Sequence, residues 1–230
     1  MNHEITEIIL RRITDLCGSH FAMQGSRKER PQDAHAGMPG SAQQHPDGSG
    51  QAVTPVLTAI DGRCCSGKTT LALRLSEQLT AHGISCSVIH MDDFFLRPAQ
   101  RTDARLAEPG GNIDYERFTT EVLEPLSRQE AFAYRPYNCR RQELGAPVPV
   151  KQAQVILIEG SYSCHPRFRD FWHLRIFMTV EEKTQLSRIE KRNGSTALPL
   201  FRERWIPTEE QYFQAFSCKE SCEFVLDTTR

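Results

Sequence analysis

Residues 62–69 constrain the fold of this chain more than any other segment. They read Gly-Arg-Cys-Cys-Ser-Gly-Lys-Thr and fit the pattern G-x-x-x-x-G-K-[ST] at every fixed position. The mostly apolar run 53–60 precedes them, and the segment 68–82, with leucines at helical spacing, follows them. This order predicts a strand, a glycine-rich turn and a helix start, an arrangement whose backbone amides surround phosphate groups.

The motif assigns a role to each type of residue in it. Its glycines let the backbone approach an anion, and we expect the N–H groups of residues 63–69 to point at phosphates. Lys68 is expected to neutralise the β- and γ-phosphates of ATP, and Thr69 to offer its hydroxyl to Mg²⁺. The predicted ATP-binding residues of this segment are Gly62, Arg63, Cys64, Cys65, Ser66, Gly67, Lys68, Thr69 and Thr70.

Strands alternate with helices through the rest of the chain, which predicts a parallel, doubly wound sheet. Beyond the segment 53–60, apolar runs predict strands at 84–90, 154–158, 174–180 and 223–226. Helical spacing predicts helices at 68–82, 114–127, 181–192 and 203–216. A loop is expected at 96–113, and a short β excursion at 131–137 and 146–150.

The first 52 residues differ in composition from the rest of the chain. Residues 1–21 are expected to hold an amphipathic helix, with its apolar pattern over 2–16. Residues 22–52 contain no Val, Ile, Leu or aromatic side chain, so they are expected to form a flexible, low-complexity linker. The main domain is then 53–230, with a lid at about 188–206.

Composition excludes several classes of protein. Lys and Arg number 28 and Asp and Glu 29, and no basic stripe with interleaved aromatics occurs, so nucleic acid is not an expected partner. The longest aliphatic run, 155–158, is too short to span a membrane, and no export signal is recognisable, so a cytoplasmic location is expected. The eight cysteines contain no C-x-x-C pair and are expected to be free thiols.

Carboxylates and arginines complete the set that a small-molecule kinase needs. Asp92 and Asp93 follow the strand 84–90, and Glu159 ends the strand 154–158, so both groups should lie at the carboxyl edge of the sheet. Arg188, Lys191 and Arg192 share one helix face, and Arg202 and Arg204 follow a loop; this layout suits a lid over ATP. No N-K-x-D motif for guanine recognition occurs.

With these motifs in view, the chain resembles the uridine kinase family and its relatives, the phosphoribulokinase, pantothenate kinase and nicotinamide riboside kinase group. The resemblance covers about 53–227. Its anchors are AIDGRCCSGKTTLA (59–72), VIHMDDFFLRP (88–98), EPGGNIDYERF (108–118), YRPYNC (134–139), VILIEGSY (155–162), RIEKRNG (188–194) and FRERWIP (201–207). It implies the three-layer α/β/α fold of P-loop NTPases, with a mostly parallel central sheet and a helical lid.

The resemblance also implies roles for single residues. Asp92 matches the general base that takes the proton from a ribose 5′-hydroxyl, and Thr69, Asp92 and Glu159 match the groups around Mg²⁺. Asp114 lies about one residue from the position of a carboxylate that binds the ribose hydroxyls, and Tyr137 matches an aromatic residue of the nucleoside pocket. Arg188 and Arg192 match lid arginines that act with Lys68 on the ATP phosphates, and Arg204 is expected to join them.

The acceptor itself stays open at this point. Asn138 and Gln142 stand where uridine kinases carry an acidic residue and a histidine that helps to read the pyrimidine. The sequence predicts ATP-dependent phosphorylation of a nucleoside 5′-hydroxyl, with nicotinamide riboside, a sugar phosphate, pantothenate or glycerate as alternative acceptors. A nucleotide-binding protein without transfer chemistry is the other alternative. Oligomeric state is equally open, and a homo-oligomer is compatible with the sequence.

The predicted linker leads to a first test. A chain that lacks most of 22–52 should keep its melting temperature within about 2 °C, because the segment has too few apolar side chains to contribute to a core. Thermal unfolding of the full and shortened chains measures this. A drop of many degrees would show that the segment is structural.

Overall fold

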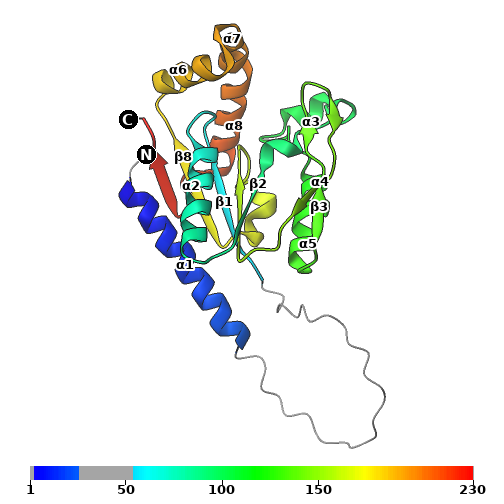
Figure 1. The fold of residues 1–230 in the computed structure, drawn as a ribbon. Helices are drawn as coiled ribbons and strands as arrows, with labels where there is room; N and C mark the ends of the chain where they lie inside the picture. Colours follow the sequence, from blue (N-terminus) through cyan, green and yellow to red (C-terminus); the bar gives the residue numbers. More distant parts are fainter. Residues whose placement is uncertain (1–2, 26–53, 230) are drawn as a thin grey trace, which may run out of the picture.

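A sheet of five parallel strands forms the centre of the molecule, in the order β2-β7-β1-β8-β9 (Figure 1). The structure, a computed structural model, describes residues 3–25 and 54–229. The strands are β1 (Val56–Gly62), β2 (Cys86–His90), β7 (Val155–Glu159), β8 (Leu174–Thr179) and β9 (Phe224–Asp227). Helices cover both faces, so the predicted three-layer α/β/α fold is confirmed.

The apolar run of β7 is explained by its central place in the sheet. All five of its residues are buried, and their side chains alternate between the two faces. Val155 and Leu157 belong to one core cluster, whereas Ile156 and Ile158 belong to the other. A strand covered on both faces has no position for a solvated side chain, and it therefore has no polar alternation.

Two helices cover one face of the sheet. They are α1 (His3–Gly25) and α2 (Lys68–Ala81), and their apolar stripes meet in one cluster, with Ile9 and Ile13 from α1 and Leu71 and Leu75 from α2. The packing site of the N-terminal helix, which the sequence left open, is therefore α2 and β1. The helix ends nine residues beyond its apolar pattern, and most of the predicted linker falls on 26–53, outside the described residues.

The opposite face is covered by a second helical layer. One continuous helical stretch combines α4 (Tyr115–Phe118), the π-helical turn η4 (Thr119–Leu123) and α5 (Glu124–Ser127); the other element is α8 (Ile206–Phe216). Phe118 and Val122 from the first stretch and Tyr212 from α8 join one aromatic-rich cluster. The short 3-10 helices η2 (Met91–Phe94) and η5 (Pro166–Phe171) add Phe94 and Phe168 to it.

The excursion between α5 and β7 consists of two small antiparallel pairs. β3 (Phe132–Tyr134) pairs with β6 (Val148–Val150), and β4 (Tyr137–Asn138) pairs with β5 (Glu143–Leu144). The expectation of a plain loop at 96–113 is wrong in part, because η3 (Pro98–Gln100) and α3 (Asp103–Ala107) lie within it. Thr102 starts α3 by accepting a hydrogen bond from the Arg105 amide, a cap that the sequence analysis overlooked.

The region predicted as a lid projects beyond the sheet at the top of Figure 1. It contains α6 (Glu182–Asn193), η6 (Ser195–Ala197), α7 (Leu198–Leu200) and the π-helical turn η7 (Phe201–Trp205), which continues into α8. α6 ends at Gly194, whose φ of 84° is the kind of backbone that glycine adopts without strain. All eight cysteines are free thiols, as predicted, and no helix in the described part of the chain could cross a membrane.

His165 stands out among the buried polar residues of the second layer. Its ring lies 5.9 Å from that of Tyr212 in a stacked arrangement and 4.5 Å from that of Tyr115. Burial, followed by the positive charge of Arg167, lowers the pKa of His165 to about 4. The imidazole is therefore neutral in the folded protein at neutral pH.

This pKa predicts how stability depends on pH. The unfolded chain takes up a proton at His165 near pH 6.5, whereas the folded chain takes it up only near pH 4. His165 therefore makes the free energy of unfolding fall by about 2 kcal/mol as the pH drops from 6.5 to 4. Urea unfolding across this range should show that the free energy of unfolding falls less steeply with decreasing pH in His165→Gln than in the parent. Parallel pH profiles would contradict the assignment.

Candidate active site

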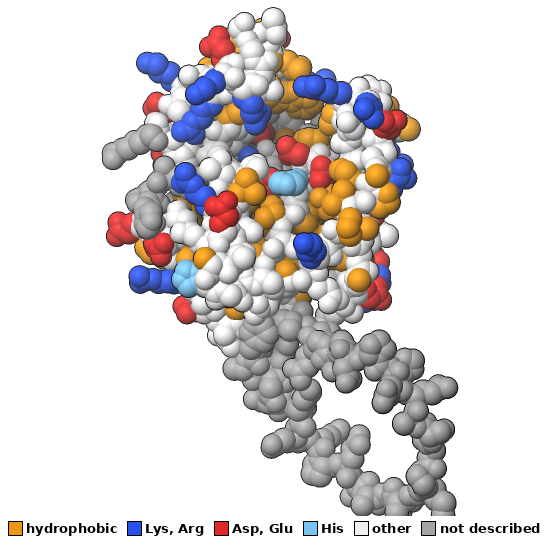
Figure 2. Space-filling view, in the orientation of Figure 1, with side chains coloured by type: hydrophobic (Ala, Val, Ile, Leu, Met, Phe, Trp, Pro, Cys, Tyr) orange, Lys and Arg blue, Asp and Glu red, His pale blue; other side chains and the backbone are white. Residues whose placement is uncertain are grey.

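A cavity of about 580 Å³ lies at the carboxyl edge of the sheet, between the phosphate loop and the lid. Figure 2 shows the hollow, with acidic side chains and a histidine within it and Lys and Arg side chains gathered above. Residues from the loop, the strand ends and α6 share this cavity. Its lining is Cys64, Cys65, Ser66, Gly67, Lys68, Thr69, Thr70, Arg74, Asp92, Glu159, Gly160, Ser161, Arg188, Arg192 and Thr228.

The loop needs glycine at both fixed positions of its motif. Gly62 has a φ of 132°, and a Cβ there would lie 1.9 Å from the carbonyl oxygen of Met178 on β8. Gly67 has a φ of 96° and immediately precedes α2. No other residue adopts both conformations at low cost, so the motif glycines follow from the backbone path itself.

The expectation that all amides of residues 63–69 face a phosphate is wrong for three of them. The Arg63 amide donates to the Met178 carbonyl, the Ser66 amide to the Arg63 carbonyl, and the Cys64 amide to the Glu209 carboxylate. These bonds give the loop its shape. Within the described residues, the amides of Cys65, Gly67, Lys68 and Thr69 have no hydrogen-bond partner, and the last three lie at the start of α2.

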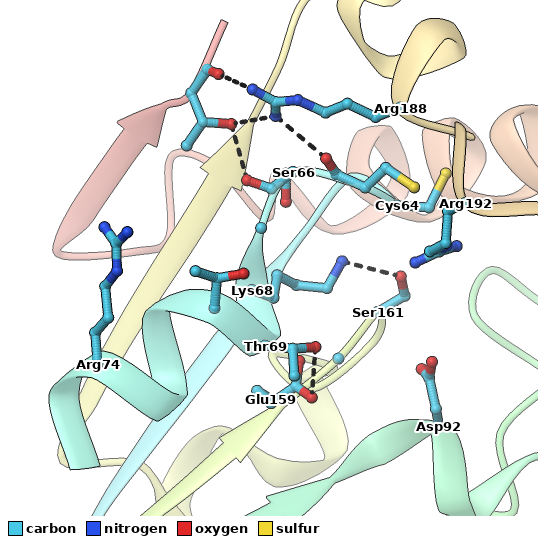
Figure 3. A pocket seen from close by; sticks show the side chains of 15 residues that line it. Cys64, Ser66, Lys68, Thr69, Arg74, Asp92, Glu159, Ser161, Arg188 and Arg192 are labelled. Carbon is cyan, nitrogen blue, oxygen red and sulfur yellow. Dashed lines mark hydrogen bonds between the residues drawn. The ribbon is translucent and has the colours of Figure 1, made fainter. Parts of the chain in front are cut away.

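Lys68 lies over its own loop. Its Nζ donates to the carbonyl oxygens of Gly62 at 2.7 Å and Arg63 at 2.9 Å, and it lies 3.5 Å from Ser161 Oγ (Figure 3). The residue is only 8% exposed. The ammonium group is thus held at the cavity wall by neutral oxygens, which a phosphate could replace.

Thr69 and Glu159 meet at the floor of the cavity. Thr69 Oγ1 donates to Glu159 Oε1 at 3.0 Å, and His90 Nδ1 donates to the same oxygen at 2.5 Å. The hydrogen bond to Glu159 is the main cause of the raised pKa of His90. A hydroxyl and carboxylates, Asp92 included, are the hard oxygen donors that Mg²⁺ prefers, so this residue set fits the metal that the sequence implied.

Asp92 opens on the cavity from the far side (Figure 3). The protein crowded around it raises its pKa, and the nearby charge of Glu159 adds to the rise, whereas Lys68 and Arg192 lower it. Its neighbour Asp93 faces elsewhere and accepts a hydrogen bond from the Tyr134 hydroxyl at 2.9 Å. Of the two adjacent carboxylates, Asp92 is therefore the one available to a ligand.

The two arginines of α6 differ in what they contact. The Arg188 guanidinium donates to the Cys65 carbonyl at 3.2 Å and to the Thr228 hydroxyl at 3.0 Å, so protein groups already hold it. Arg192 lies beside the cavity opening, with its Nε bonded to Asn193 (Figure 3). Arg204, predicted to join them, lies over the Trp205 ring instead and does not line the cavity.

The residues predicted for the acceptor lie beside the cavity rather than in it. Asp114 is buried and caps α4; its oxygens accept from the Arg117 amide at 3.1 Å and the Gln100 side chain at 2.9 Å. Tyr137 is buried on β4, and its hydroxyl lies 3.5 Å from the Arg101 guanidinium. An acceptor that binds Asp114 must therefore displace Gln100.

The loop cysteines are in surroundings that disfavour the thiolate. Burial is the main cause of a raised pKa at both Cys64 and Cys65, and it outweighs the lowering by nearby positive charges. Neither thiol is activated by its place near the start of α2.

Sequence reasoning missed several polar residues of this region. Asp61, fully buried at the end of β1, accepts hydrogen bonds from the amides of Gly62, Tyr162 and Cys164 and from the Tyr212 hydroxyl. Ser161, Glu209 and Thr228 also bond to the loop or to Lys68. Ser161 follows Glu159-Gly160 and could have been inferred from that strand end, but no local pattern marks Glu209 or Thr228.

Comparison with known proteins places this geometry in context. No family model matches the chain. "Uridine kinase-like protein 3" from Arabidopsis thaliana is 28% identical over 147 residues, which are 60% of this chain and 31% of that protein. The "Uridine kinase" of Leuconostoc citreum (strain KM20) is 27% identical over 145 residues, which are 60% of this chain and 68% of that protein. The chain thus spans about a third of the length of the plant relative.

A solved structure described as a "Possible Uridine Kinase" from Bacillus stearothermophilus has the same fold. It aligns with a TM-score of 0.59 at 20% identity over 94% of this chain and 98% of that one. The chain is similar to uridine kinases. The resemblance predicted from its motifs is thereby confirmed.

Arg188 and Arg192, the two arginines of α6 that line the cavity, should differ in their effect on stability. Arg188→Ala removes bonds to Cys65 and Thr228 and should lower the free energy of unfolding by about 2 kcal/mol. Arg192→Ala removes an exposed side chain and should change it by less than about 0.5 kcal/mol. Urea unfolding without nucleotide measures both. Equal losses would contradict the difference in their contacts.

Proposed function

We propose that this protein transfers a phosphoryl group from ATP to a hydroxyl group of a small molecule, and that the acceptor is the 5′-hydroxyl of a nucleoside such as uridine or cytidine. One observation carries the proposal. The phosphate loop, Lys68, Asp92 and Glu159 share a single cavity although they come from three separate strand ends. Nucleotide binding alone does not need a proton acceptor, and Asp92 places one beside the phosphate site.

The loop provides the phosphate site. Amides of Cys65, Gly67, Lys68 and Thr69 surround the start of α2, where the helix dipole favours an anion. Lys68 can leave its carbonyl partners for the β- and γ-phosphates, since a charged oxygen is a stronger acceptor than a carbonyl. Binding of the triphosphate thus replaces neutral contacts by charged ones.

Asp92 supplies the base. Its carboxylate opens on the cavity, and its pKa is raised by crowding and by Glu159, which makes it a better proton acceptor than an ordinary aspartate. It is proposed to orient the acceptor hydroxyl and to accept its proton as the oxygen attacks. Asp93 is bonded to Tyr134 and takes no part in this step.

Thr69, Asp92 and Glu159 would hold Mg²⁺. When bound, the ion neutralises charge on the β- and γ-phosphate oxygens. His90 donates to Glu159 Oε1 and so orients this carboxylate from behind. The arrangement leaves the other Glu159 oxygen for a ligand or for water.

The lid supplies positive charge and excludes water. Arg192 lies at the opening and is proposed to approach the phosphates on closure, while Arg188 keeps the loop attached to α6. Closure also protects ATP from hydrolysis, because water would otherwise compete with the acceptor. The lid arginines thus act after the nucleotide is bound.

The names of the relatives support a nucleoside as the acceptor, and Asp114 and Tyr137 are proposed to contact it. A panel of acceptors tests this choice. Release of ADP from Mg-ATP would be measured with uridine, cytidine, adenosine, nicotinamide riboside, pantothenate, glycerate and ribulose 5-phosphate. If only a non-nucleoside is phosphorylated, the proposed acceptor is wrong but the phosphoryl transfer is supported. If no acceptor of the panel causes ADP release, the result counts against phosphoryl transfer.

Two substitutions test the mechanism. Lys68→Ala and Asp92→Asn should each lower kcat at least about 100-fold, because one removes charge stabilisation and the other the base. Far-ultraviolet circular dichroism and thermal unfolding serve as the control for folding. Near-normal turnover in Asp92→Asn would refute the role of Asp92.

A further inference from the structure

Glu209 connects the lid to the phosphate loop. It lies in the first turn of α8, directly after the lid, and is only 5% exposed. Its Oε2 accepts from the Cys64 amide at 2.9 Å, and its Oε1 accepts from Ser161 Oγ at 2.6 Å. A buried carboxylate is costly unless it is fully hydrogen-bonded, so these contacts with the loop and with the segment after β7 define its position.

The rest of the loop backbone is held in the same manner. Three side chains from the C-terminal third of the chain donate to three successive loop carbonyls. Gln185 bonds to Cys64 at 3.1 Å, Arg188 to Cys65 at 3.2 Å and Thr228 to Ser66 at 2.8 Å. Both α6, which belongs to the predicted lid, and α8, which follows it, are therefore attached to the phosphate loop, and neither can move far without affecting it.

The contact through Ser161 extends to Lys68. Ser161 Oγ donates to Glu209 and lies 3.5 Å from Lys68 Nζ, within reach of a long hydrogen bond from the ammonium group. Burial raises the pKa of Glu209, and the positive charge of Lys68 opposes this rise, so the two side chains attract each other directly. Glu209 therefore favours the position of Lys68 in which the ammonium group lies on the loop carbonyls rather than over the cavity.

We infer that Glu209 is a positioning residue. Through Ser161 it keeps the Lys68 ammonium group on the loop carbonyls while the nucleotide site is empty. It also attaches α8 to the phosphate loop, so that nucleotide binding affects the position of the lid. The inference rests on the proposed function, because it assumes that the ligand of the loop is a nucleoside triphosphate. Phosphates that draw Lys68 into the cavity must overcome its attraction to Glu209. Glu209 thus lowers the affinity for ATP and couples ATP binding to α8.

Glu209→Gln isolates the charge. The glutamine has the same shape and can still accept from the Cys64 amide, while its NH₂ group faces Ser161. The loop keeps its hydrogen bond from the Cys64 amide, but the negative charge that attracts Lys68 toward the loop carbonyls is removed. In full-length protein, titration calorimetry with Mg-ATP and no acceptor should show a Kd lower by about 3- to 10-fold.

A double-mutant cycle separates this role from a structural one. In a Lys68→Ala background, Glu209→Gln should change the Kd for Mg-ATP by less than about 2-fold, because the group it acts on is gone. Glu220→Gln removes one exposed carboxylate outside the cavity and serves as the charge-matched control. If Glu209→Gln proves unstable in thermal unfolding, Ser161→Ala cuts the same link with a smaller change and should shift the Kd in the same direction.

The outcomes separate the role of Glu209 from the proposed kinase function. The same fold-change in both backgrounds, or none in either, would overturn the role of Glu209 and leave the proposed function intact. Failure of the unmodified chain to bind Mg-ATP would refute the proposed function itself. A shift that depends on Lys68 supports the inference.

Discussion

A single buried carboxylate, Asp61, connects the parts that build the cavity. It accepts four hydrogen bonds, from the backbone of the phosphate loop, from two amides of the segment after β7 and from the Tyr212 hydroxyl on α8. Burial raises its pKa, and the amide and hydroxyl donors oppose that rise. Without these donors a charge at this depth would be unfavourable, so the ends of β1 and β7 and the side of α8 are fixed relative to one another.

Lys68 and Thr69 start α2 and Glu159 ends β7, so the distances between these side chains depend on this junction. Lys68 and Thr69 take their direction from the turn that Gly62 makes against Met178. Glu159 ends a strand whose register with β1 pairs it with Ile60. A small shift between β1 and β7 would therefore separate the phosphate loop from the carboxylate that Thr69 contacts.

The region predicted as a lid is attached to the same junction. α6 bonds to the loop backbone through Gln185 and Arg188, and α8, which follows this region, bonds to it through Glu209. Among the described residues, the short elements between Ser195 and Trp205 make no such bond to the loop.

The phosphate loop, the strands and helices of the sheet and the edge where the carboxylates lie could all be predicted from the sequence, because each has a short-range pattern: glycine spacing, apolar runs, a polar residue at a strand end. The position of Arg204, the occupied oxygens of Asp114 and the helix α3 were not foreseen, because they depend on neighbours or on a cap that the hydrophobic pattern does not show. Glu209 lies 145 residues from the amide it accepts from. The sequence by itself determined the fold and the chemistry available to it, while only the tertiary structure decided which polar groups are free and which are engaged, since that depends on contacts between distant segments.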